Sequence, residues 1–108
     1  MALYMTQFSY TTEAWQAMVK NPQDRSGVLK NLIEKLDGRL IGLYFCFGEY
    51  DGVAIYEYPE DVTCAGGALA VISAGHLKTM ETTKLIRGDE LVAAMKIANG
   101  QVYPGPKE

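Results

Sequence analysis

The sequence predicts an α+β protein in which an antiparallel four-stranded sheet carries helices on one face. Three observations support this prediction. Short segments alternate apolar and polar residues, as strands do. Other segments space apolar residues by three and four, as helices do. Glycine or proline separates most of them. The 108 residues allow one domain, which we expect to span residues 1–99, with a C-terminal tail at 100–108.

Four segments have the alternation and the aromatic and β-branched content of strands. They are residues 2–10, 39–47, 53–58 and 76–86. The pentapeptide Gly-Glu-Tyr-Asp-Gly at 48–52 separates the second strand from the third. Glycine accepts positive φ and Asp-Gly suits tight turns, so this stretch predicts a hairpin turn.

The first helical region follows the first strand. Thr11 or Thr12 is positioned to cap it, because a hydroxyl there can accept a bond from a free amide of the first turn. Pro22 interrupts or kinks this helix. Helical spacing then resumes with Leu29 and continues until Asp37-Gly38 ends it.

Two further helices are expected after the third strand. The first follows Pro59-Glu60-Asp61, which places acidic groups at the positive end of the helix dipole, and Gly75 stops it. It is built from small residues, including Gly66-Gly67, which close packing of the helix on the sheet explains. A last short helix runs from Gly88 to about residue 98.

The resulting order, β-α-β-β-α-β plus a C-terminal helix, is that of the ferredoxin-like plait. Right-handed crossovers place the strands in the order 4-1-3-2 and leave one sheet face without helices. Strict alternation in 40–47 puts apolar side chains on both faces: Ile41, Leu43, Phe45 and Phe47 on one, Leu40, Tyr44 and Cys46 on the other. A second copy of the chain is the simplest cover for the open face, so we expect a homodimer or higher oligomer.

Composition excludes several function classes. A net charge of −3 with scattered basic residues argues against a nucleic-acid partner. The longest apolar run, 40–47, is too short to span a bilayer, and the first residues lack the basic region of a signal peptide. One histidine and no CxxC motif predict no metal and no cofactor. Cys46 and Cys64 are expected to be buried free thiols, which indicates a cytoplasmic protein.

Two stretches resemble the GYD domain family. These are GEYDGVAIYEYPED and GHLKTMETTKLI, the first containing the Gly-x-Tyr-Asp signature as Gly48, Tyr50 and Asp51. The resemblance extends from Leu3 to near Ala98. It implies a fold of the dimeric α/β-barrel superfamily, in which two plaits pair their open sheet faces, but it implies no particular reaction.

The predicted topology brings three segments to one end of the sheet: the end of the first strand, the GEYDG turn and the start of the fourth strand. This placement suggests an acid–base or ligand-binding site. The candidate catalytic residues are His76, Asp51 and Tyr50. The candidate ligand-binding residues are Tyr10, Tyr50, Asp51, Glu57, His76 and Glu81. Tyr50 and His76 can meet within one chain only if the turn folds back across the sheet.

Each candidate also has a purely structural interpretation. Asp51 can serve the turn, and His76 can lie at a helix end. Glu57 and Glu81 can be solvated or paired at sheet edges. Four tyrosines are more typical of core or interface positions; they are Tyr4, Tyr44, Tyr56 and Tyr58.

Three functions therefore remain open. The first is a small-molecule-binding protein with a cavity between the plait and its partner. The second, implied by the resemblance, is a small cofactor-independent enzyme of the oxygenase or isomerase type. The third is a structural module whose sheet face serves only oligomerisation. Binding is favoured over catalysis because no nucleophile–base spacing occurs.

Overall fold

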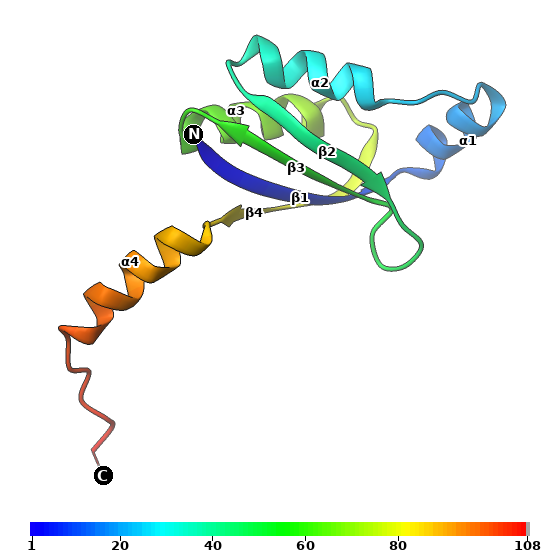
Figure 1. Ribbon diagram of the computed structural model, residues 1–108. Helices are drawn as coiled ribbons and strands as arrows, with labels where there is room; N and C mark the ends of the chain where they lie inside the picture. Colours follow the sequence, from blue (N-terminus) through cyan, green and yellow to red (C-terminus); the bar gives the residue numbers. More distant parts are fainter. Residues whose placement is uncertain (108) are drawn as a thin grey trace.

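The predicted α+β plait is confirmed by the computed structural model of the chain, which describes residues 1–107. The sheet is antiparallel in the predicted order, β2-β3-β1-β4, and α2 and α3 lie on one of its faces (Figure 1). The elements are β1 (Ala2–Tyr10), α1 (Thr12–Lys20), α2 (Ser26–Lys35), β2 (Arg39–Phe45), β3 (Gly52–Tyr58), α3 (Asp61–Ser73), β4 (Leu77–Leu85) and α4 (Gly88–Asn99).

The first helical region forms two separate helices. Thr11 caps α1, with its hydroxyl accepting a hydrogen bond from the Ala14 amide at 3.1 Å. The helix ends before Pro22, whose ring cannot continue it. In Figure 1, α1 lies beyond the end of the sheet, and its apolar residues Trp15 and Val19 are 39% and 74% exposed.

Only one glycine of the Gly66-Gly67 pair in α3 packs closely. A Cβ on Gly67 would lie 2.5 Å from the phenol oxygen of Tyr58, so a larger residue would not fit there. Nothing lies within 4 Å of a Cβ on Gly66, so close packing does not explain the glycine at position 66. Gly75 follows the helix with φ of +84°, the left-handed conformation that suits glycine at a helix end.

The predicted alternation of β2 is wrong in the middle of the strand. The pairing with β3 shifts between Leu40 and Gly42, because a bulge adds one residue to β2. Leu40 and Leu43 consequently face the same side, where both pack against the core. Tyr44 lies on the opposite face.

The connection between β2 and β3 is a longer loop, 46–51. Among residues 1–107, only Asp37 and Gly75 have positive φ, so the hairpin turn with positive-φ glycines predicted at 48–52 is not formed. Gly52 belongs to β3, where a Cβ would overlap the ring of Phe8. Cys46 lies just after β2 and is exposed, contrary to the expectation of a buried thiol, whereas Cys64 is buried as expected.

The core lies between the helices and the sheet. Its buried residues are Tyr4, Ile33, Ala54, Tyr56, Tyr58 and Cys64. Three of the six are tyrosines, whose hydroxyl groups require partners when they are buried. The helix-covered side of the sheet is therefore an apolar interior that also contains polar atoms.

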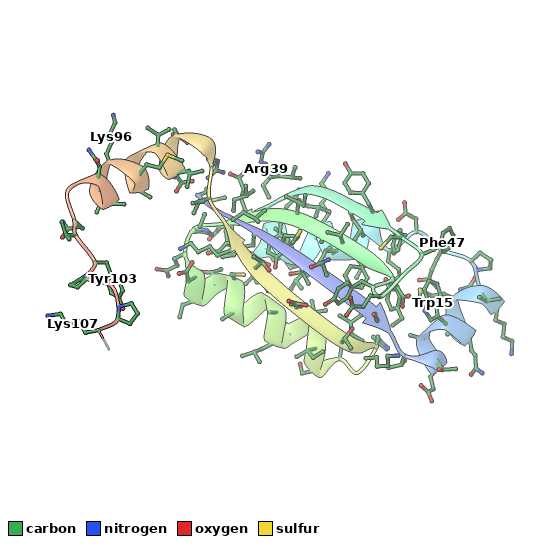
Figure 2. All side chains as sticks on the ribbon, turned by 90° about the horizontal axis from the view of Figure 1, so that it is seen from below. Trp15, Arg39, Phe47, Lys96, Tyr103 and Lys107 are labelled. Atoms are coloured by element: carbon green, nitrogen blue, oxygen red, sulfur yellow. The ribbon has the colours of Figure 1, made fainter. Side chains whose placement is uncertain are left out.

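The opposite face of the sheet is uncovered. Seen from below, the four strands lie in front of α2 (Figure 2). The strand register places Leu3, Met5, Val53 and Ile55 on this face, and Tyr44 is 61% exposed. The helix α4 extends away from the sheet (Figure 1), with none of its residues 88–99 buried.

Candidate functional site

The three segments predicted to meet at one end of the sheet do so. The Thr11 amide donates a hydrogen bond to the His76 carbonyl oxygen at 3.0 Å. On the other side of β1, the Asp51 amide donates to the Phe8 carbonyl oxygen at 2.8 Å. The β2–β3 loop and the start of β4 are thus both attached to the end of β1.

Asp51 fixes the geometry of this end. Its Oδ2 accepts hydrogen bonds from the Tyr10 amide at 2.9 Å and from the Trp15 indole nitrogen at 3.1 Å. A charged acceptor strengthens both bonds. The carboxylate therefore connects the β2–β3 loop to β1 and to α1, which is a structural role but not the bonding within the turn that was expected.

Tyr50 does fold back across the sheet, but its partner is Glu81. The Tyr50 phenol donates a hydrogen bond to the Glu81 carboxylate of β4. The same bond raises the pKa of Tyr50 to about 12, because the phenolate would lose the bond and face a carboxylate. Glu81 pairs with Gln7 in the sheet register, which places the Tyr50–Glu81 pair on the uncovered face.

Glu57 lies at the other end of the sheet. Its Oε1 accepts from Arg39 at 3.0 Å, and its Oε2 accepts from Arg87. The hydrogen bond from Arg39 and the positive charges of both arginines hold the pKa of Glu57 below its ordinary value. Arg87 also donates to the Met1 carbonyl oxygen at 3.1 Å, so this cluster joins β2, β3 and the start of α4.

A cavity of about 550 Å³ lies between α2, α3 and the helix-covered face of the sheet. Tyr10 and His76 line it, whereas the other four candidate residues do not. The cavity expected from the sequence was on the uncovered face, toward a partner. This one is on the opposite face, because α2 and α3 lie far enough apart to leave space between them.

Hydroxyl groups form part of the cavity wall. The Tyr56 hydroxyl is 2.5 Å from Thr6 Oγ1, which is 2.8 Å from Thr82 Oγ1. Burial raises the pKa of Tyr56 to about 12, so its phenol is neutral at physiological pH. Nearby, the Tyr4 hydroxyl donates to Asp61 Oδ1 at 2.6 Å. The hydroxyls of Thr6, Tyr56 and Thr82 therefore bond to one another, whereas the Tyr4 hydroxyl bonds to a carboxylate whose side chain is exposed.

Two features of this region are not predicted by the sequence. Tyr56 and Tyr58 are buried core aromatics, as expected, but they also line the cavity, which was not predicted. Arg25 lines it as well, but it belongs to the segment between the first two helices, where no pattern predicts its direction. The only available signal was a cation immediately before a helix with an apolar face.

Two kinds of feature are not found in the part of the chain that the structure describes. No three His, Cys, Asp or Glu side chains in residues 1–107 come together in a metal-binding arrangement. Over the same residues, no helix is both long enough and apolar enough to cross a membrane.

Comparison with known proteins identifies relatives of the whole domain. The model of one protein family, described as GYD domain, matches residues 4–95. A protein of Thermus thermophilus named "Glutamine synthetase and cystathionine beta-lyase binding protein" is 29% identical over 96 residues, covering 89% of this chain and 100% of that protein.

Solved structures share the fold at low identity. MtbAldR is 12% identical with a TM-score of 0.55; the match covers 80% of this chain but only 52% of that one. An uncharacterised NIPSNAP domain protein from Burkholderia xenovorans is 17% identical with a TM-score of 0.51, covering 82% and 95% of the two chains. Both similarities concern the α+β fold alone.

Proposed function

The chain belongs to the GYD domain family, and we propose that it is a homo-oligomeric protein that binds a small molecule in the cavity between its helices and its sheet. The observation that carries this proposal is the cavity itself. Its volume of about 550 Å³ lies within the range of roughly 300–1,000 Å³ typical of ligand pockets.

The composition of the wall supports a ligand in this position. The pocket is partly open to solvent, so a ligand that covers its apolar wall removes that apolar surface from water. Here Leu29, Ile33 and Val71 line the cavity together with the Thr6 and Tyr56 hydroxyls. Apolar walls with a few polar groups are typical of sites that bind and orient small organic molecules.

Two surfaces support homo-oligomerisation. The uncovered sheet face carries apolar or aromatic side chains from three strands, including Met5, Tyr44 and Ile55. The helix α4 has 12 residues, and isolated helices shorter than about 12–15 residues are marginal in water. Leu91 and Met95, one turn apart on α4, are 44% and 57% exposed. A second copy of the chain would cover both surfaces.

The direct test of ligand binding uses two neighbouring residues of α3. Ala68 lines the cavity, whereas Leu69 is 66% exposed on the outer side of the helix. We expect a small molecule to co-purify with the wild type and with Leu69→Phe but not with Ala68→Phe, as measured by mass spectrometry of denatured extracts. Equal amounts of every small molecule in all three extracts would contradict the proposal.

Catalysis is a weaker hypothesis than binding. Of the candidate catalytic residues, Asp51 accepts two structural hydrogen bonds and Tyr50 is bonded to Glu81. Only His76 lines the cavity. A purely structural module would in turn not need the cavity. The proposal of a small-molecule-binding protein includes the cytoplasmic location that the free cysteines predict.

A protein partner is a second candidate function. The name of the Thermus thermophilus relative states that it binds two enzymes. In this alternative the exposed apolar residues of α4 are a helical docking surface that the partner, and not a second copy of the chain, covers. If this surface binds glutamine synthetase, sedimentation of the two proteins together will show a complex that Leu91→Gln/Met95→Gln abolishes. Separate sedimentation of the two wild-type proteins would exclude that partner.

A further inference from the structure

We infer that the cavity binds an anionic amphiphile, with its apolar body between α2, α3 and the sheet and its anionic head group beside Arg25 and His76. This inference rests on the proposed function and names the chemical class of the ligand. A carboxylate with an aliphatic or aromatic body has the required chemistry.

The charges around the cavity favour an anionic ligand. Its basic lining residues are Arg25, Lys35 and His76, and among residues 1–107 no Asp or Glu lines it. The whole chain has the opposite balance, with 13 acidic and 10 basic residues. A wall that has basic groups and lacks carboxylates, in an acidic protein, is electrostatically complementary to an anion.

Two of these basic groups lie together with a phenol at one end of the cavity. Tyr10, Arg25 and His76 also line a smaller cavity of about 140 Å³ beside α1, so they lie where the two cavities adjoin. Arg25 acts electrostatically on Tyr10: burial raises the pKa of that phenol, and the nearby guanidinium partly offsets the increase, whereas the more weakly acting Asp51 carboxylate adds to it. A phenol, a guanidinium and an imidazole are thus grouped at one end of the cavity.

Arg25 is suited to a carboxylate. Its Nη1 donates to Gln23 Oε1 at 3.1 Å, and a guanidinium carries five N–H donors in a planar fork that matches a carboxylate. The rest of the wall is mainly apolar. It includes Val28, Leu32, Leu43, Ala68, Val71 and Met80. The ligand therefore needs an apolar body as well as a negative charge.

The test compares octanoate with 1-octanol, which have the same chain length and differ in head-group charge. Isothermal titration calorimetry on the intact protein should show octanoate binding at least about tenfold more tightly, because a charge-assisted bond to Arg25 exceeds a neutral one. Arg25→Gln should remove most of that difference and leave octanol affinity unchanged. His76→Gln provides a second variant with the same expected direction.

Lys30→Gln is the matched control, since Lys30 lies on α2 outside the cavity, with its side chain 62% exposed. It should change neither affinity. Ala68→Phe should abolish both interactions. Equal affinity for octanoate and octanol in the wild type would overturn the anionic specificity while leaving the cavity as a binding site. Binding that survives Ala68→Phe, or no binding of either probe, would overturn the site itself.

Discussion

At the scale of single residues, Asp51 accepts bonds from the Tyr10 amide and the Trp15 indole. Replacing it with alanine removes this acceptor, and we expect a loss of about 1 kcal/mol in the free energy of unfolding, because the exposed Trp15 indole can bond to water instead. Asp51→Asn keeps an acceptor oxygen and should lose less. Urea titration measures both. Equal stability of wild type and Asp51→Ala, combined with lost ligand retention, would instead assign Asp51 to the binding site.

Glu57 predicts a pH dependence of stability. Arg39 and Arg87 depress its folded-state pKa, so the ionised carboxylate stabilises the folded chain above the ordinary glutamate pKa of about 4.3. This contribution decreases as the pH falls through the ordinary and then the folded-state value. Urea titrations should therefore show that the free energy of unfolding falls less between pH 7 and pH 3 for Glu57→Gln than for the wild type. An identical loss in both would show that the two arginines do not stabilise the carboxylate.

At the scale of elements, α3 offers a matched pair of adjacent glycines. A methyl group on Gly67 meets the buried Tyr58, whereas one on Gly66 meets open space. Gly66→Ala should stabilise the protein by up to about 1 kcal/mol through helix propensity. Gly67→Ala should destabilise it by about 1–3 kcal/mol through overpacking. Thermal unfolding distinguishes the two, and equal shifts would mean that α3 does not pack closely on Tyr58.

Local patterns predicted the order of these elements and failed where contacts override them. Thr11 begins α1 and Gly75 ends α3 as expected, since capping depends on residues close in the chain. The bulge in β2 reversed the facing of Leu43 because it depends on pairing with β3. Gly52 serves the packing of Phe8 in β3, a contact that no local pattern reveals.

The candidate site depended even more on distant contacts. Its meeting point at the end of β1 followed from topology alone. The bond between Tyr50 and Glu81 could not be predicted, because it depends on the path of the β2–β3 loop over the uncovered face. The cavity required the separation of α2 and α3, which no segment of the sequence encodes by itself.

At the scale of the whole molecule, the uncovered sheet face predicts association. Ile55 lies near the middle of this face, whereas Leu69 is exposed on α3. Ile55→Lys should therefore shift the protein toward monomer, because a charge would be buried in the interface without a partner. Leu69→Lys should leave the assembly unchanged. Light scattering after size-exclusion chromatography measures the mass of each, and a shift in both variants would place the interface elsewhere.

Native mass spectrometry of the purified wild-type protein tests the central proposal most directly, since it reports subunit number and bound small molecules together. We predict a species of at least two chains of 11.9 kDa, with the additional mass of one small molecule per chain that collisional activation releases. A bare 11.9 kDa monomer at micromolar concentration would contradict both the oligomer and the ligand.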